Sequence, residues 1–110
     1  MSTKPKGRPI ECSMTVDQMQ VRVHELAVAN GWWDAPRPFA EFVANLHDEV
    51  SEVWHAYAHG QDDKIPEELA DLALRLLDWC EGTGIDLGTE IARKHEINRR
   101  REYRHGGKRA

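Results

Sequence analysis

Two pairs of carboxylates repeat one spacing in the middle of this 110-residue sequence. Glu49 and Glu52 are three residues apart, and Glu68 and Asp71 repeat that step after a short polar break. Carboxylate oxygens in this number are ligands that Mg²⁺, Mn²⁺ or Ca²⁺ prefer, whereas zinc favours nitrogen and sulfur. Without a cation, four close anions would repel one another. The alternative is that both pairs are solvated helix surface, so their positions in space decide between the two.

The apolar pattern around these pairs predicts two adjacent helices. Residues 39–58 carry an apolar stripe at helical spacing, and a second stripe follows Pro66, which suits the start of a helix. At roughly 100° per residue, both carboxylate pairs lie on the same flank of their stripes. The short link at residues 59–65 favours antiparallel packing. We therefore expect the four carboxylates to converge at one edge of the core.

Capping signals predict the two remaining helices. Thr15 and Gln18 form a candidate capping box ahead of a helix over residues 16–30. Asp86 is a candidate N-cap for a helix that runs to about residue 101. The third helix is expected to end before the glycine that follows its stripe. Because no segment alternates in the manner of a strand, the predicted fold class is all-α.

The sequence predicts a single small domain between two tails. Residues 14–104 are expected to form a compact four-helix arrangement with an antiparallel central helix pair. Residues 1–13 are rich in Lys, Pro and Gly and predict a disordered tail, and residues 105–110 predict a flexible tail that contacts substrate. A domain of this size often gains burial by association. We therefore expect a homo-oligomer.

Charge is distributed unevenly along the chain. Residues 41–90 contain thirteen Asp and Glu against two Lys and Arg, whereas residues 93–110 contain eight Lys and Arg against two Glu. An acidic centre with a basic end suits a ligand of mixed charge, such as a metal cation bound to phosphates. On the fourth predicted helix Lys94, Asn98 and Arg101 share one face and are candidates for phosphate binding.

Three further residues are candidates for substrate contact. Lys108, in the Gly-rich tail, is a candidate clamp on phosphate oxygens. Trp32 and Trp33 lie in a loop before the acidic helix, and their indole faces suit stacking on a base. The alternative for both tryptophans is that they cap a small core.

Taken together, these segments resemble the MazG-type all-α nucleoside triphosphate pyrophosphohydrolases over most of the chain. The pattern of that family is E-E-x-x-E, a spacer, and then E-x-x-D. The chain reads Asp48-Glu49-x-x-Glu52, fifteen residues, and then Glu68-x-x-Asp71. Asp48 stands where the family has its first Glu, and the other four positions match.

The resemblance implies an activity and a quaternary structure. It implies Mg²⁺-dependent hydrolysis of a (deoxy)nucleoside triphosphate to a nucleoside monophosphate and pyrophosphate, as in nucleotide-pool house-cleaning, by a homodimer or homotetramer.

Neither a signal peptide nor a membrane-spanning stretch is expected. Cys12 and Cys80 are isolated thiols, which suits a reducing cytoplasm. No stable nucleic-acid partner is expected.

Each candidate residue then has an expected role. Glu49, Glu52, Glu68 and Asp71 are the expected ligands of Mg²⁺, for which Mn²⁺ is a substitute. Water is the expected nucleophile, because no Ser, Cys or Lys has a recognisable activating partner. Glu52, with Glu49 beside it, is the first candidate to orient or deprotonate that water. The resemblance also implies that Lys94 and Asn98 contact the substrate.

Two alternatives use the same residues differently. A di-iron carboxylate bundle needs a Glu-x-x-His motif on each of two helices. Glu52 with His55 provides one such motif, but Asp71 is followed three residues later by Leu74. A non-enzymatic helical adaptor or nucleic-acid-binding module would use the Arg-rich C-terminal helix. That alternative gives the converging carboxylates no task.

Overall fold

The computed structural model describes residues 4–101, and within that range it contains helices and no strand, which confirms the all-α class. The elements in chain order are α1 (Val16–Ala29), α2 (Phe39–Ala58), the short 3-10 helix η1 (Asp62–Lys64), α3 (Ile65–Thr83) and α4 (Leu87–Arg99). Among the described helices, none combines the length and the apolar character needed to cross a lipid bilayer.

Local capping explains where the first and last helices begin. The Thr15 side chain accepts a hydrogen bond from the backbone N–H of Gln18, and the Gln18 side chain accepts one from the backbone N–H of Thr15. These reciprocal bonds confirm the capping box. At α4, the Asp86 carboxylate accepts from the backbone N–H of Thr89, which confirms the predicted N-cap.

The end of α3 differs from the prediction. The helix continues through Gly82 to Thr83, and Gly84 closes it in the left-handed conformation at a φ of 77°. Gly82 has another task, because a Cβ at this position would overlap the indole of Trp33. The sequence pattern therefore identified the wrong glycine as the stop, and Gly82 allows a tryptophan to lie directly against the helix.

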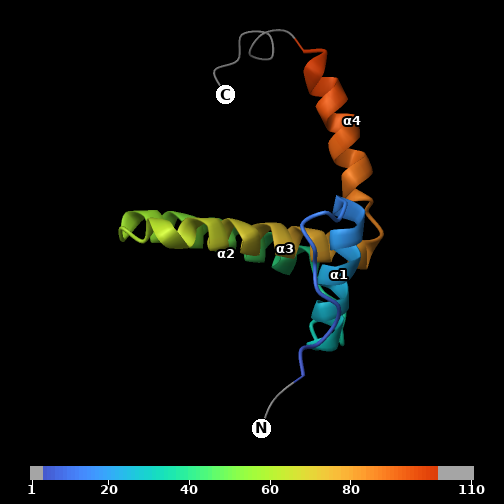
Figure 1. Cartoon of the computed structure of the whole chain (residues 1–110), viewed down its shortest axis with the longest axis horizontal. Helices are drawn as coiled ribbons and strands as arrows, with labels where there is room; N and C mark the ends of the chain where they lie inside the picture. Colours follow the sequence, from blue (N-terminus) through green and yellow to red (C-terminus); the bar gives the residue numbers. More distant parts are fainter. Residues whose placement is uncertain (1–3, 102–110) are drawn as a thin grey trace.

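The helices form an open arrangement. The chain runs out along α2, turns through η1 and returns along α3, so that α2 and α3 lie side by side (Figure 1). α1 packs against α3, and α4 departs from this junction with its main helix contact on α1. The radius of gyration is 16.8 Å, compared with about 13 Å for a compact domain of this length. The expected compact arrangement is therefore wrong, because α4 does not fold back on the α2–α3 pair.

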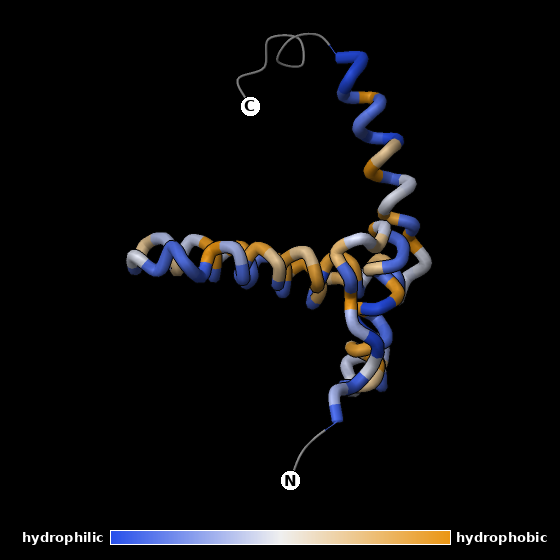
Figure 2. Tube along the Cα trace, in the orientation of Figure 1, coloured by the Kyte–Doolittle hydropathy of each residue, from blue (hydrophilic) through white to orange (hydrophobic). Residues whose placement is uncertain are grey.

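Apolar burial is concentrated where α1 meets the α2–α3 pair. Phe42 and Trp79 are buried there with their rings stacked, 4.5 Å between centroids. Figure 2 shows that hydrophobic positions continue along the pair. In the outer part of the pair, however, Val50, Trp54 and Tyr57 are each more than half exposed. The predicted stripe of α2 is thus buried at Phe42 and largely open to solvent at these three outer positions.

The N-terminal segment lies along α1 (Figure 1). Lys6 Nζ donates a hydrogen bond to Asn30 Oδ1 at 3.1 Å. Arg8 Nε donates to Glu25 Oε2 at 3.0 Å, and a second nitrogen of Arg8 contacts the other oxygen of Glu25. Composition predicts a disordered tail for residues 1–13, and within this segment Lys6 and Arg8 have partners on α1 or at its C-cap. Because these partners come from another part of the chain, the composition of the segment alone does not indicate them.

Candidate metal centre

Three carboxylates from two helices meet on one side of the α2–α3 pair. Glu49 from α2 and Glu68 and Asp71 from α3 each offer an oxygen, and the three oxygens lie within 4.8 Å of one another. In an octahedral Mg²⁺ shell with bonds of 2.0–2.1 Å, ligand oxygens are about 3 to 4 Å apart. Binding of a cation would therefore draw the three oxygens closer together. The all-oxygen donor set fits Mg²⁺ or Mn²⁺ better than zinc.

Glu52, the fourth expected ligand, is exposed and lies outside this group of three. It is nevertheless close enough to act on the group electrostatically. Desolvation raises the pKa of Glu68, and the negative charges of Asp71, Glu52, Glu67 and Glu49 raise that pKa further. A carboxyl group in these surroundings binds a proton more readily, and a divalent cation relieves the same repulsion. The site chemistry therefore fits a resident cation.

Arg75 provides a direct counter-charge to this cluster. Its Nε donates a hydrogen bond of 2.6 Å to Glu49 Oε1, which leaves the other oxygen of Glu49 available to a cation. Such a bond fixes the orientation of a metal-binding carboxylate. In the sequence, Arg75 stands out only as one of two basic residues among residues 41–90. It follows Asp71 by one helical turn, and this spacing could have indicated that Arg75 lies beside the carboxylates.

A cavity of about 900 Å³ opens beside the cluster. Glu49 and Asp71 line one part of it, α1 contributes another wall, and residues 5–10 border it as well. Trp32, which is 59% exposed, also faces this cavity. The volume lies within the range of about 300–1,000 Å³ that small-molecule sites occupy. Two of the three cluster carboxylates are therefore part of the wall of a space that can hold a nucleotide.

Comparison with known families supports this interpretation. The family model of the MazG nucleotide pyrophosphohydrolase domain matches residues 38–105, which is more than half of the chain. The chain belongs to the MazG nucleotide pyrophosphohydrolase domain family. Neither curated proteins nor solved structures gave a significant match. Membership indicates a nucleotide pyrophosphohydrolase that depends on a divalent metal, and the cluster offers residues able to bind one.

The MazG match and the cavity do not have the same boundaries. Residues 38–105 include Glu49, Glu68 and Asp71, so the matched segment carries the whole cluster. The opposite walls of the cavity come from residues 5–10, α1 and Trp32, all of which precede the match. The cavity therefore combines a wall from the MazG segment with walls that lie outside it.

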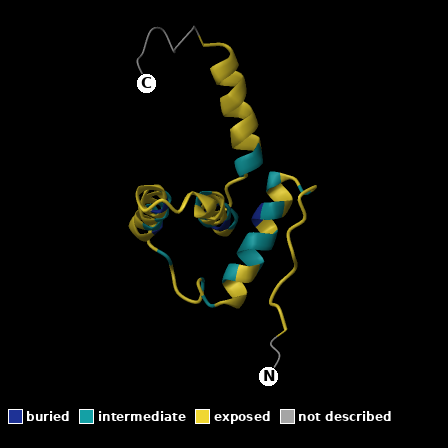
Figure 3. Cartoon of the chain, turned by 60° about the vertical axis from the view of Figure 1, so that its left-hand side comes forward, coloured by how far each residue is buried: buried dark blue, intermediate teal, exposed yellow. Residues whose placement is uncertain are grey.

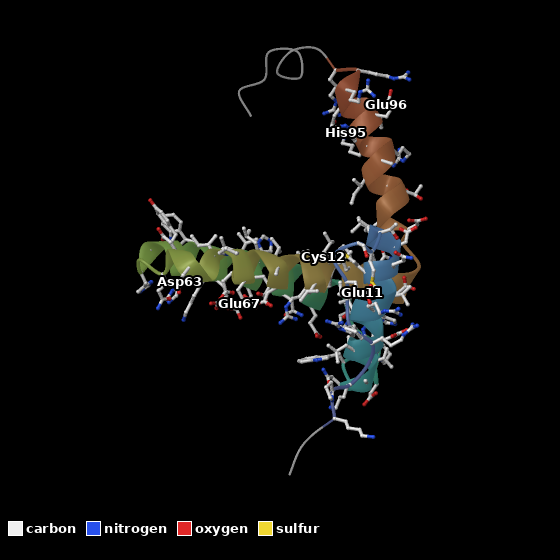
Figure 4. All side chains as sticks on the ribbon, viewed as in Figure 1. Glu11, Cys12, Asp63, Glu67, His95 and Glu96 are labelled. Carbon is white, nitrogen blue, oxygen red and sulfur yellow. The ribbon has the colours of Figure 1, made fainter. Side chains whose placement is uncertain are left out.

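The basic face of α4 is not part of this cavity. Lys94, Asn98 and Arg101 are exposed, and α4 is exposed beyond its first two residues (Figure 3). The helix points away from the α2–α3 pair, as the labelled His95 and Glu96 show in Figure 4. Within one chain, these three residues are not brought to the carboxylate cluster. Lys108 lies outside the described residues.

A second acidic centre on α3 was missed by sequence reasoning. Asp78 is 8% exposed, and its carboxylate accepts hydrogen bonds from Trp33 Nε1 at 2.9 and 3.2 Å and from Arg37 at 2.9 Å. His24 Nδ1 lies 2.9 Å from the same carboxylate. These partners are 41 to 54 residues away in sequence, so no local spacing indicates them. The structure thus uses Trp33 in the core, while Trp32 faces the cavity.

Proposed function

We propose that this MazG domain hydrolyses a (deoxy)nucleoside triphosphate in the presence of Mg²⁺, giving a nucleoside monophosphate and pyrophosphate. The observation that carries the proposal is the meeting of Glu49, Glu68 and Asp71 beside a cavity of nucleotide size, which Glu49 and Asp71 line. The family match adds the reaction class. A role in clearing nucleotides from the cytoplasmic pool goes with this activity.

The proposed mechanism divides the work among the carboxylates. Glu49, Glu68 and Asp71 hold the cation, and Mn²⁺ substitutes for Mg²⁺ because both accept oxygen ligands. When bound, the cation neutralises triphosphate charge and offsets the charge that develops on the pyrophosphate leaving group. Glu52, exposed beside the cluster, accepts the proton of the attacking water. Arg75 keeps Glu49 in position through their hydrogen bond.

We further propose that the active form is a homodimer or homotetramer in which α2 and α3 act as an antiparallel pair. Val50, Trp54 and Tyr57 leave an apolar face exposed on α2, and a second copy of the chain would cover it. A partner subunit also provides a way to bring the basic face of α4 to the cluster. On this proposal Lys94 and Asn98 act on the phosphates of a neighbouring site.

The test is a pyrophosphate-release screen over canonical and modified nucleoside triphosphates with Mg²⁺. We expect at least one triphosphate to give monophosphate and pyrophosphate in equal amounts, and EDTA to abolish the reaction. Release of orthophosphate in place of pyrophosphate would refute the reaction proposed. Salt-sensitive micromolar binding to generic RNA or DNA, without any triphosphate hydrolysis, would favour the nucleic-acid-binding alternative.

A further inference from the structure

Four arginines line the cavity beside the carboxylate cluster. Three of them are held by carboxylates of the same chain: Arg8 by Glu25, Arg37 by Asp78 and Arg75 by Glu49. The fourth, Arg22 on α1, forms no ion pair within residues 4–101, and its buried Nε has no hydrogen-bond partner there. Arg22 is therefore the cavity arginine that is left to meet a ligand.

The hydrogen bonds of Glu25 explain why Arg22 has no direct ion pair, although the charge of Arg22 still lowers the pKa of Glu25. Glu25 follows Arg22 by three residues on α1, a spacing at which opposite charges on a helix normally interact. Both oxygens of Glu25 are instead taken by Arg8 from the N-terminal segment. A buried donor without a partner costs stability. Of the Arg22 side-chain nitrogens only Nε is buried in this way, so the terminal nitrogens remain available to an anion in the cavity.

We propose that Arg22 is a substrate-binding residue that receives a phosphate group of the nucleotide. This inference rests on the proposed function, because the nucleotide is the ligand of that same site. The carboxylates Glu49 and Asp71 on one part of the cavity wall bind the cation of a metal-bound phosphate chain, and Arg22 on another part meets its oxygens. The planar guanidinium suits phosphate oxygens, to which it donates two parallel hydrogen bonds.

This assignment differs from the α4 candidates in two respects. Arg22 precedes the residues that match the MazG family, whereas Lys94 and Asn98 fall within them. Arg22 also lines the same cavity as the carboxylates in a single chain, without help from a partner subunit. Arg8 then acts as a positioning residue, because it occupies Glu25 and leaves Arg22 available.

The test compares Arg22→Ala and Arg22→Lys with wild type, and Arg93→Ala serves as the matched control. Arg93 is exposed on α4 and pairs only locally with Glu90. Isothermal titration with inorganic tripolyphosphate and Mg²⁺ measures phosphate binding without a nucleoside. We expect Arg22→Ala to weaken binding by about 10- to 100-fold, because its charge-assisted contact with the phosphate is lost. Arg22→Lys should recover part of that loss, and Arg93→Ala should bind as wild type does.

Two further readouts separate ligand binding from a structural role. On the best substrate of the screen, Arg22→Ala should raise KM with little change in kcat, because the contact is made in ground and transition states alike. Its Tm should be unchanged or raised, because an unpaired charge is removed. If Arg22→Ala lowers Tm sharply, Arg22→Lys and Arg22→Gln decide: weaker binding in the Gln variant than in the Lys variant supports the inference, and equal binding in the two variants overturns it.

The inference and the proposed function can fail separately. Wild-type affinity of Arg22→Ala for tripolyphosphate overturns the role of Arg22, while pyrophosphate release by the wild type leaves the function intact. If no triphosphate is hydrolysed but tripolyphosphate binding depends on Arg22, the phosphate contact stands and the hydrolase proposal fails.

Discussion

Two acidic centres lie on the same helix and have opposite surroundings. Asp78, near the end of α3, is buried and receives donors from Trp33 and Arg37, with His24 also at hydrogen-bond distance. About two turns earlier, Asp71 shares its site with two other carboxylates, to which Arg75 brings one hydrogen bond. The first centre holds α1, the tryptophan loop and α3 together. The second is left with negative charge that a cation can neutralise.

The difference shows how a structural carboxylate is distinguished from a metal-binding one. A buried carboxylate that is fully hydrogen-bonded has no capacity left for a ligand, and removing it leaves the charge of its buried partner uncompensated. A group of carboxylates with few donors gains stability only when a cation arrives. The two centres should therefore respond differently to mutation, to pH and to Mg²⁺.

Asp78→Ala should destabilise the protein by about 3–5 kcal/mol, the usual result of leaving a buried charge without its partner. Here that charge is the guanidinium of Arg37, whose side chain is 11% exposed. Urea unfolding at one fixed protein concentration measures the change. The control is Asp63→Ala, an exposed residue at the outer end of the α2–α3 pair (Figure 4), which should stay within about 0.5 kcal/mol of wild type. Equal stabilities for the two variants would refute the structural role of Asp78.

Asp71→Asn should lower kcat by about two orders of magnitude or more, the scale of losing a major electrostatic contact. The metal-free fold should remain intact or become more stable, because repulsion within the cluster is reduced. Glu67→Gln is the control: Glu67 is exposed, labelled in Figure 4, and lies outside the group of three. Steady-state kinetics with saturating Mg²⁺ provide the measurement. Wild-type rates in both Asp71→Asn and Glu52→Gln would rule out the carboxylate site.

The sequence predicted the helices and much of the cluster because both depend on local spacing. The caps at Thr15 and Asp86 lie within a few residues of the helices that they begin. The apolar stripes likewise lie within the helices that they define. Asp78 was missed because its partners come from other elements. The direction of α4 was missed as well, since the pattern of a helix does not state the angle at which it leaves its neighbour.

Arg22 shows a further limit of prediction from sequence. A lone arginine with a glutamate three residues later reads as an ordinary surface pair. Its availability depends on Arg8, which lies in a segment whose composition predicts disorder. Only the packing of residues 4–13 on α1 reveals that Glu25 is already occupied.

Metal-free protein should become less stable as pH rises through the range in which folded Glu68 loses its proton. Because the pKa of Glu68 is raised in the folded state, that state binds more protons than the unfolded chain between the two pKa values. Unfolding free energy therefore falls with rising pH. Tm measured against pH in EDTA should show this fall in wild type and a smaller one in Glu68→Gln. Identical profiles for the two proteins would contradict it.

Mg²⁺ should reverse this effect, because the cation takes the place of the proton. At about one hundred times its Kd, a bound cation adds about 2.7 kcal/mol to stability. The wild-type Tm should therefore rise with Mg²⁺ at neutral pH, and the gain should be smaller in Glu68→Gln. A Tm that does not respond to Mg²⁺ would show that the carboxylate cluster, like Asp78, does not bind a cation.

A smaller effect concerns Glu25, whose pKa is shifted in the opposite direction to that of Glu68. Arg8 lowers the pKa of Glu25, chiefly through their hydrogen bond. The stability from this pair is therefore fully present above the unfolded-state pKa of Glu25 and is lost as pH falls through its folded-state pKa. Any Tm difference between wild type and Arg8→Ala should disappear in acid, the reverse of the Glu68 profile. A difference that persists at acid pH would show that Arg8 stabilises the protein by another route.

Arg8→Ala also tests how Arg22 is kept available. With Arg8 removed, Glu25 is free to pair with Arg22, and such a helix pair is worth about 0.2–0.5 kcal/mol. KM for the triphosphate should therefore rise by about twofold. The double variant Arg8→Ala with Glu25→Gln removes the competing carboxylate and should return KM to near the wild-type value. If KM stays raised in the double variant, Arg8 itself contacts the phosphates, and the N-terminal segment is a direct part of the binding site.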